Sequence, residues 1–234
     1  MIPAGGIDAV LVDAGGVLLV PDPEAVRREL AAFGVEPDDE ACLRAHYLSM
    51  REVDRIGPGD WPTVDRCFAR AVGVAEDRVE DAVPFVDSIY MRDRWTPAAG
   101  AAEALVALQD AGVPIAVVSN AGGTMEDQLL AHDICSVDGA THARVAIVVD
   151  SDVVGVEKPD PKIFTFALDA LGVDATRCIY VGDTVAFDVV GARAAGLWPI
   201  HVDPYDLCPD RDDHPHASSL AAVAQTVLGK QNVV

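Results

Sequence analysis

Five short apolar segments of strand character recur along the chain, and most of them are followed by a segment whose apolar residues have helical spacing. They are Ala9–Val12, Ile115–Val118, Val145–Val149, Cys178–Val181 and Pro199–Val202. Alternating strands and helices predict an α/β fold with a parallel sheet. Because ligands bind beyond the carboxyl ends of the strands in such sheets, polar residues that end these segments are the first candidates for a functional site.

The long interval between the first two segments, residues 21–94, contains no convincing strand. Its apolar residues recur at threes and fours in four stretches, Val26–Phe33, Cys42–Val53, Val64–Val72 and Val79–Tyr90. We therefore expect a helical cap domain over residues 21–94, inserted into a core domain made of residues 1–20 and 95–234. Such a cap would lie over the strand ends as a mobile lid, and a bundle that only extends the core is the alternative.

The charge balance excludes several classes of partner. Of the 234 residues, 38 are acidic and 17 are lysine or arginine, which gives a formal net charge of −21. This charge opposes the phosphate neutralisation on which nucleic-acid binding depends, and it disfavours anionic membranes. The five cysteines form no C-x-x-C pair, and no stretch resembles a signal peptide or a membrane span, so we expect a reducing, cytoplasmic setting.

Three aspartates stand at or near the ends of predicted strands. Asp13 ends the first strand and precedes Gly15 and Gly16, while Asp183 ends another strand and Asp188 follows five residues later. Mg²⁺ takes oxygen ligands, commonly one or two carboxylates with phosphate and water, so these three acids could form one metal site from two strands. The alternatives are a turn aspartate at position 13 and acids at a helix N-terminus at 183 and 188.

Two further segments are suited to binding a phosphate. Ser119 and Asn120 end a strand before a glycine pair, whose backbone N–H groups could hold an anion at a helix start, and an ordinary N-cap and turn is the alternative. Lys158 is one of three lysines and precedes a proline that fixes an extended backbone before a helix. A rigidly held ammonium group there could neutralise phosphate charge, although a solvated surface lysine is the commoner arrangement.

In order and spacing, these segments resemble the motifs of the haloacid dehalogenase superfamily, in particular its phosphatase-like members with a helical cap. The matching residues, Asp13, Ser119, Lys158 and the pair Asp183 and Asp188, extend over nearly the whole chain. The resemblance implies a Rossmann-like three-layer core with a parallel sheet and an inserted α-helical cap. It also implies a hydrolase that uses Mg²⁺ and acts on a small phosphorylated metabolite.

The resemblance implies a role for each of these residues. Asp13 would attack phosphorus to form an aspartyl-phosphate. Ser119 and Lys158 would act in catalysis and, with Asn120, would bind the phosphate. The Mg²⁺ ligands would come from Asp13, the Gly15 carbonyl, Asp183 and Asp188. These parts suit phosphoryl transfer, whose transition state is stabilised mainly by positioning and by neutralising charge.

The chain departs from the family pattern at Gly15, where phosphatases usually carry a second aspartate that protonates the leaving alkoxide and later activates water. General acid–base catalysis contributes about 10²–10⁴ in rate, so its loss predicts slow turnover or a substitute acid, either Asp22 or a residue of the cap. Two alternatives follow: a 2-haloacid dehalogenase-type hydrolase, or a non-catalytic protein that binds Mg²⁺ and phosphate. Phosphonatase chemistry is excluded because no lysine lies within residues 21–94. Sugar-phosphate mutases, which depend even more on the missing aspartate, are disfavoured.

Two further groups of residues are candidates for binding roles. Within the cap, His46, Arg51, Arg55 and Trp61 are candidates for substrate specificity, although solvated or structural roles are commoner. Residues 203–215 and the following His216 mix aspartate, cysteine and histidine, including Cys208 and His214. That mixture could indicate a second metal site, and a solvated loop is the expected structure.

Overall fold

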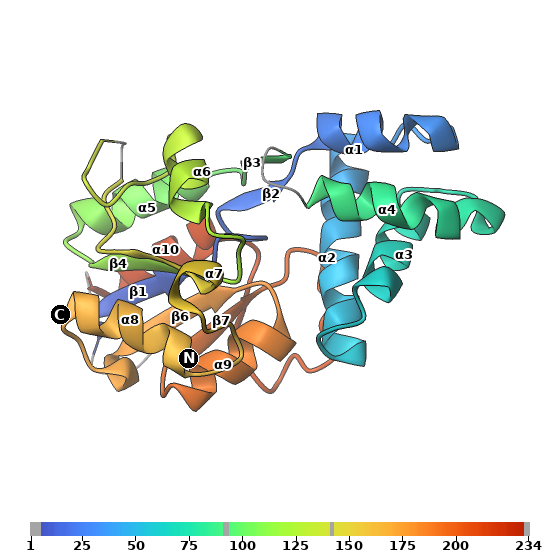
Figure 1. Ribbon diagram of the computed structural model, residues 1–234. Helices are drawn as coiled ribbons and strands as arrows, with labels where there is room; N and C mark the ends of the chain where they lie inside the picture. The colour runs from blue at the N-terminus through green and yellow to red at the C-terminus, as the bar shows by residue number, and fades with distance from the viewer. Residues whose placement is uncertain (1–5, 91–93, 141–142, 232–234) are drawn as a thin grey trace.

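A computed structural model describes residues 6–90, 94–140 and 143–231, so the parts of the expected domains at residues 1–5, 91–93, 141–142 and 232–234 lie outside it. Within the described residues, six strands form one parallel sheet in the order β5-β4-β1-β6-β7-β8 (Figure 1). The strands are β1 (Ala9–Val12), β4 (Ile115–Ser119), β5 (Val148–Asp150), β6 (Cys178–Gly182), β7 (Trp198–Val202) and β8 (His216–Ala217). This sheet, with helices on both faces, confirms the predicted α/β fold.

The register of the sheet brings the ends of three strands together. Val12 at the end of β1 is paired with Val117 of β4 on one side and with Val181 of β6 on the other. The next residue, Asp13, donates its backbone N–H to the Val181 carbonyl at 2.8 Å. The polar residues that follow β1, β4 and β6 therefore meet at one edge, as parallel pairing requires.

Alternate residues of the strands face opposite layers of the molecule. Val10 and Val12 of β1 belong to one apolar cluster, whereas Ala9 and Leu11 belong to the other. The first cluster lies under α5 (Ala101–Asp110), α6 (Met125–Ala131) and α10 (Leu220–Gln231), and the second lies under α8 (Lys162–Leu171) and α9 (Val190–Ala194). Both faces are buried, which explains why the strands read as continuous apolar runs in the sequence.

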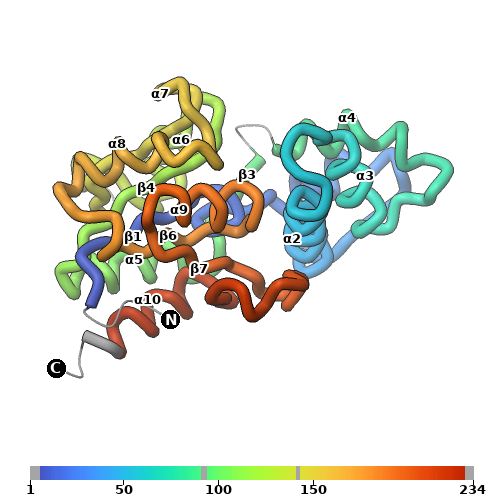
Figure 2. The backbone as a smooth tube through the Cα atoms, turned by 90° about the horizontal axis from the view of Figure 1, so that it is seen from below, coloured from blue at the N-terminus to red at the C-terminus, as the bar shows by residue number. Residues whose placement is uncertain are grey.

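Four helices between β1 and β4 form an insertion with its own apolar core (Figures 1 and 2). The helices are α1 (Pro23–Leu30), α2 (Asp39–Ile56), α3 (Trp61–Ala71) and α4 (Val79–Ile89). The chain enters this insertion through β2 (Leu19–Pro21) and returns to the core through β3 (Trp95–Pro97). These two strands pair antiparallel. The four predicted helices are confirmed, and we call residues 23–89 the helical cap.

One predicted strand begins later than expected. The sequence predicts a strand over Val145–Val149, but β5 covers only Val148–Asp150. Val145 donates its backbone N–H to the Ser136 carbonyl of the preceding loop, whereas Ala146 donates to the Ile115 carbonyl of β4. Hydrogen bonding to the loop therefore replaces strand pairing at Val145, while Ala146 already contacts the neighbouring strand.

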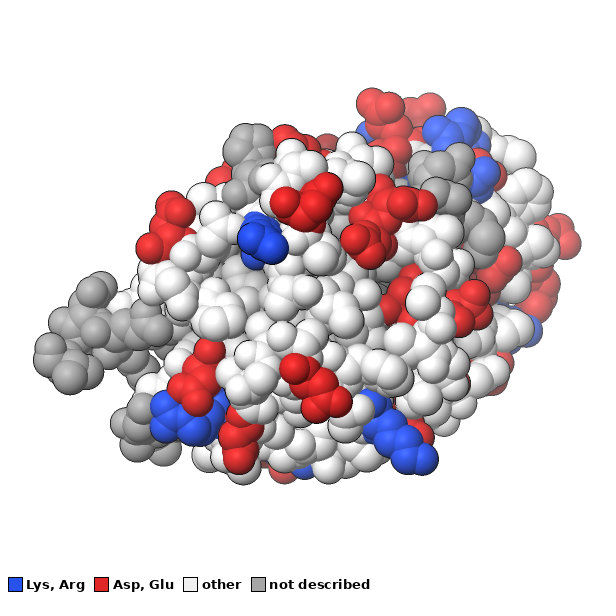
Figure 3. Space-filling model, turned by 60° about the vertical axis from the view of Figure 1, so that its left-hand side comes forward, with Lys and Arg blue, Asp and Glu red and all other residues white. Residues whose placement is uncertain are grey.

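Acidic side chains begin several of the helices and account for part of the excess negative charge. Asp22, Asp38 and Asp60 each accept a backbone N–H group at the start of α1, α2 and α3. Asp22 is therefore a helix cap, and this contact does not support its proposed use as a substitute acid. Figure 3 shows one face of the molecule, on which acidic side chains outnumber the basic ones scattered between them.

Among the described residues, no helix is both long enough and apolar enough to span a bilayer.

A buried carboxyl group in the cap predicts a pH dependence of stability. Only 6% of Asp65 is exposed, and its burial, with the charge of Asp87, raises the pKa of Asp65 from 3.8 to about 7. Folded Asp65 therefore keeps its proton to a higher pH than the unfolded chain does. Its favourable contribution is present below about pH 4 and is lost as the pH rises to about 7.

We expect Asp65→Asn to flatten this fall in the free energy of unfolding, measured by urea denaturation at several pH values between about 4 and 7. Asp81→Asn is the control, because it removes an exposed acid from α4 of the same cap. An unchanged slope in Asp65→Asn would contradict the assignment of the pH dependence to this carboxyl group.

Candidate active site

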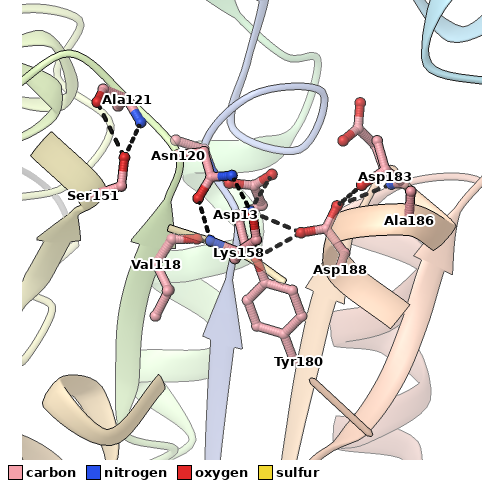
Figure 4. Close-up of polar contacts among 12 residues, drawn as sticks. Asp13, Val118, Asn120, Ala121, Ser151, Lys158, Tyr180, Asp183, Ala186 and Asp188 are labelled. Carbon is pink, nitrogen blue, oxygen red and sulfur yellow. Dashed lines mark hydrogen bonds and ion pairs between the residues drawn. The ribbon is translucent and has the colours of Figure 1, made fainter. Parts of the chain in front are cut away.

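A buried lysine lies between the carboxylates that follow β1 and β6 (Figure 4). The Lys158 ammonium nitrogen is 2.9 Å from Asp13 Oδ2 and 2.7 Å from Asp188 Oδ1. It also donates to the Tyr180 hydroxyl oxygen at 2.9 Å, and only 2% of Lys158 is exposed. Burial lowers the pKa of Lys158, but the charges of Asp13 and Asp188 outweigh it and raise that pKa. The two carboxylates thus keep the ammonium group ionised inside the protein.

Asp188 is the most completely bonded of the acids. Its Oδ1 accepts from Lys158 and from the Tyr180 hydroxyl at 2.9 Å, while Oδ2 accepts from the Thr184 N–H at 2.9 Å and the Thr184 hydroxyl at 2.6 Å. Burial would raise the pKa of Asp188, but Lys158 and Thr184 lower it below its usual value. These bonds occupy about four lone-pair sites, which is the full accepting capacity of a carboxylate. The geometry therefore favours Asp188 as the group that orients Lys158, and the binding of a metal by Asp188 stays a prediction.

Asp13 has fewer partners than Asp188. Its Oδ1 accepts the Ala14 N–H at 2.7 Å, and Oδ2 faces Lys158. Burial raises the pKa of Asp13 to about 7; Lys158 opposes this rise, while Asp188 and Asp183 add to it. Three buried carboxylates therefore share the charge of one lysine, which leaves the cluster short of positive charge.

The donor set suits a hard divalent cation. One carboxylate oxygen from each of Asp13, Asp183 and Asp188 lies within 4.8 Å of the other two. Oxygen donors and a local excess of negative charge are what Mg²⁺ requires. The residues present therefore fit the metal that the resemblance implies, with Asp13 and Asp183 as the acids best placed to bind it directly.

Two glycines allow the acids to approach the backbone. Gly16 has φ +66°, and a Cβ atom there would collide with the Asp183 carboxylate. A Cβ atom on Gly182 would overlap the side chain of Asp188 in the same way. The glycines after β1 and at the end of β6 are thus required by close packing of carboxylates against the chain.

The predicted phosphate-binding residues differ in how the structure uses them. Ser119 is the last residue of β4 and is buried. The Asn120 side chain donates to the Lys158 carbonyl at 3.0 Å and accepts the Lys158 N–H at 2.7 Å. Asn120 therefore fixes the backbone of Lys158, and its predicted phosphate contact finds no support in these side-chain bonds.

A buried aspartate that the sequence analysis missed occupies part of the expected anion site. Asp150 accepts the backbone N–H groups of Gly123 at 3.0 Å and Met125 at 3.1 Å. The Gly123 N–H group, which the sequence suggested for phosphate, is therefore already bonded. Asp150 ends β5, so its place after a strand was the available signal, but its role depends on the neighbouring loop.

Helix α2 of the cap contacts the carboxyl end of the sheet at three points. His46 Nε2 is 3.1 Å from Asp183 Oδ2, and the Tyr47 hydroxyl donates to the Gly16 carbonyl at 2.7 Å. Asp54 Oδ1 accepts the N–H groups of Val185 and Ala186, both at 2.8 Å. The cap is therefore closed on the core. Burial raises the pKa of Asp54 to about 7, although the two hydrogen bonds from Val185 and Ala186 act to lower it.

The cap residues proposed for specificity have different surroundings. His46 is buried, with its Nδ1 3.4 Å from the Tyr90 hydroxyl oxygen. Arg55 pairs with Glu52, and Trp61 stacks on Phe187 of the core with ring centroids 6.3 Å apart. Arg51 is exposed and borders a cavity of about 10 Å³ between cap and core, which also reaches Asp183.

Sequence patterns did not reveal the residues that hold the acids in place. Tyr180 lies within an apolar strand, where an aromatic residue is ordinary core, yet its hydroxyl bonds both Lys158 and Asp188. His201 lies within β7, and its Nε2 is 3.1 Å from the Asp183 carbonyl oxygen. These three partners lie outside the strands, 8 to 22 positions away in the chain, so no local pattern marks the contacts.

The close approach at Gly16 predicts a large cost for adding a methyl group. Gly16→Ala should lower the free energy of unfolding by more than the about 1–2 kcal/mol of a left-handed backbone alone, because the methyl group also displaces Asp183. Gly34→Ala is the matched control, since Gly34 has φ +74° with no atom within 4 Å of the added Cβ. Equal losses in the two variants, measured by denaturant unfolding, would contradict the steric argument.

Comparison with known proteins identifies the family. Residues 7–196 match the family model of haloacid dehalogenase-like hydrolases. The chain is 36% identical over 191 residues to a phosphoglycolate phosphatase from Xylella fastidiosa strain 9a5c, covering 80% of this chain and 76% of that protein.

Two solved structures share the fold. A haloacid dehalogenase-type phosphatase from Thermococcus onnurineus is 21% identical with a TM-score of 0.58, covering 95% of this chain and 98% of that one. L-2-haloacid dehalogenase from Xanthobacter autotrophicus is 20% identical with a TM-score of 0.56, covering 96% and 99%. With the Asp13, Lys158 and Asp183 cluster in place, the family match shows that the chain belongs to the haloacid dehalogenase-like hydrolases.

Proposed function

We propose that this protein hydrolyses small phosphomonoesters, with Asp13 as nucleophile and Mg²⁺ as cofactor. The observation that carries the proposal is the buried group of three carboxylates around one lysine at the carboxyl end of the sheet. This group combines a nucleophile, a place for a divalent cation and a fixed positive charge. The phosphatase among the sequence relatives supports the choice of substrate class.

In the first step, an oxygen of the Asp13 carboxylate forms a bond to phosphorus while the bond from phosphorus to the ester oxygen breaks. Asp13 and the phosphate are both anions, so their approach needs positive charge nearby. Asp13, Asp183 and the Gly15 carbonyl would hold Mg²⁺, which would supply that charge when bound. Water then attacks phosphorus of the aspartyl-phosphate and releases inorganic phosphate and the Asp13 carboxylate.

Lys158 contributes a second positive charge at a fixed point. Asp188 and the Asn120 amide hold its side chain and its backbone respectively, so the ammonium group needs little reorganisation when phosphate binds. In the absence of phosphate it contacts Asp13 directly at 2.9 Å. A phosphate oxygen would share this ammonium group with the nucleophile, which lowers the repulsion between the two anions.

The closed cap bears on substrate entry. The cavity beside Asp183 measures about 10 Å³, which is room for about one water molecule and none for a phosphomonoester. We infer that the cap moves away to admit substrate and closes to exclude water, with the α2 contacts at Asp183, Gly16 and residues 185–186 breaking and reforming.

His46 is the residue we propose to replace the acid missing at Gly15. Its Nε2 lies 3.1 Å from Asp183, and it is the imidazole that the closed cap places against the carboxylates. In this role the Nε2 proton passes to the leaving alkoxide. The returning proton comes from the water that attacks the aspartyl-phosphate.

Asp13→Asn tests the nucleophile. We expect Mg²⁺-dependent release of phosphate from p-nitrophenyl phosphate by the parent protein, none in EDTA, and a loss of more than about 10³-fold in kcat in Asp13→Asn. Asp8→Asn is the control, because it removes a partly exposed acid just before the same strand, where Asp8 pairs with Arg177. Phosphate release that survives in Asp13→Asn would contradict the proposal. The proposal would also be contradicted if the parent protein released halide from a 2-haloacid without metal and released no phosphate from the ester.

The leaving group tests His46. An alkyl phosphate needs a proton on its departing oxygen, whereas p-nitrophenolate leaves unaided, so His46→Gln should lower kcat by about 10²-fold or more for the alkyl ester only. Gly15→Asp should restore turnover in that variant, because a Cβ at Gly15 meets only ordinary contact, 3.8 Å from the Trp95 ring. His132→Gln, away from the carboxylates, is the control. Equal losses on both esters would contradict the role of His46.

A further inference from the structure

A second group of metal-binding side chains lies beside β7, apart from the carboxylates. His201, Cys208, His214 and His216 each present one nitrogen or sulfur atom, and these four atoms lie within 4.8 Å of one another. The first three residues are buried and His216 is partly buried. The segment after β7 was expected to be a solvated loop, which holds for its exposed acids Asp206, Asp210 and Asp212 but not for Cys208 and His214.

The backbone brings the four residues together from separate positions. His201 and His216 are register partners in the neighbouring parallel strands β7 and β8, so their side chains are adjacent. Asp203 accepts the N–H groups of Leu207 at 2.8 Å and Cys208 at 3.0 Å, which fixes the turn that carries the thiol. Figure 2 shows this segment, in dark orange and red, running beside α2.

Hydrogen-bond partners outside the group orient two of the imidazoles. His201 Nε2 is 3.1 Å from the Asp183 carbonyl oxygen, and His214 Nδ1 is 3.2 Å from Asp213 Oδ2. An oxygen acceptor at one ring nitrogen places the proton there and leaves the lone pair on the other. His201 Nδ1 and His214 Nε2 therefore turn their lone pairs inward, the arrangement that outer-shell acceptors impose on histidines that bind metals.

Two distances between inward atoms are close to those of a tetrahedral site. His201 Nδ1 is 3.1 Å from His214 Nε2, and Cys208 Sγ is 3.8 Å from the same nitrogen. Metal–nitrogen and metal–sulfur bonds of about 2.0–2.1 and 2.3 Å give tetrahedron edges of about 3.3 Å between nitrogens and about 3.6 Å between nitrogen and sulfur. Small side-chain shifts would bring the observed distances to these values.

Without a cation, the group leaves polar atoms unsatisfied. Two lone pairs 3.1 Å apart repel each other unless a proton or a metal lies between them. Among the described residues, His216 Nε2 is buried and has no hydrogen-bond partner. A buried nitrogen without a partner costs about 1–3 kcal/mol, so this atom, beside two imidazole nitrogens and a thiol that face one another, points to a shared ligand.

We propose that His201, Cys208, His214 and His216 bind one Zn²⁺ ion. A thiolate with three imidazoles is a donor set for zinc rather than for magnesium, which prefers oxygen ligands. Four protein ligands complete a tetrahedral shell with no open position, so the ion has a structural role. It would fasten the segment after β7 to β8, and through His201 it would support the backbone carbonyl of Asp183 in the active site.

The test uses the full chain purified without a polyhistidine tag. After treatment with a chelator, we expect the protein to take up one equivalent of Zn²⁺ with high affinity and to show a higher melting temperature, since zinc binds the folded state. Co²⁺ in place of Zn²⁺ should give the strong visible bands of tetrahedral cobalt and a near-ultraviolet charge-transfer band from thiolate. No tight equivalent, or weak octahedral cobalt bands, would overturn the proposal.

Variants locate the ion. Cys208→Ser should abolish the thiolate band. Loss of an outer-shell partner typically weakens metal binding by about 10–100-fold, and His216→Gln, which removes a ligand itself, should weaken zinc binding by more than that. Asp213→Asn should itself weaken binding by about 10–100-fold. Cys67→Ser and Asp13→Asn are controls, the second because it alters the carboxylate cluster. Zinc binding that is lost in Asp13→Asn, or unchanged in both ligand variants, would contradict the assignment.

Discussion

The buried ammonium group of Lys158 is the interaction on which the site depends. It lies between Asp13 and Asp188, at 2.9 and 2.7 Å, and a charge at this depth persists only when it is paired. Removing the lysine would leave both buried carboxylates without their positive partner, at a cost of about 3–5 kcal/mol for a broken buried pair. The ends of β1 and β6 and the loop that carries Lys158 are therefore held in one arrangement by electrostatics as well as by the sheet.

One lysine does not balance three carboxylates, and the rest of the site follows from that imbalance. Burial and the charges of Asp188 and Asp183 raise the pKa of Asp13 to about 7, so the imbalance disfavours its ionised form. A divalent cation would restore the balance and would supply the positive charge that the proposed phosphoryl transfer needs. His46 of the cap lies 3.1 Å from Asp183, so the proposed movement of the cap would break a contact with these same charges.

The sequence predicts the α/β fold, the four cap helices and the strand ends because these depend on local periodicity, which neighbouring residues determine. It also selects Asp13 and Asp183 by their places after predicted strands, and Lys158 by the rarity of lysine and the proline that follows it. Contacts across the sheet are not visible in this way. Asn120 holds the Lys158 backbone and Asp150 occupies the Gly123 N–H group because distant loops meet there, and no spacing along the chain encodes those meetings.

The central claim is that Asp13 becomes covalently phosphorylated. The most direct measurement is a single turnover of a phosphomonoester with Mg²⁺, quenched in acid within the first turnover and analysed by peptide mass spectrometry. The account predicts one added phosphoryl group on the peptide that contains Asp13, rising and then decaying as inorganic phosphate appears. Turnover with no phosphorylated peptide at any time, or with the group on another residue, would contradict it.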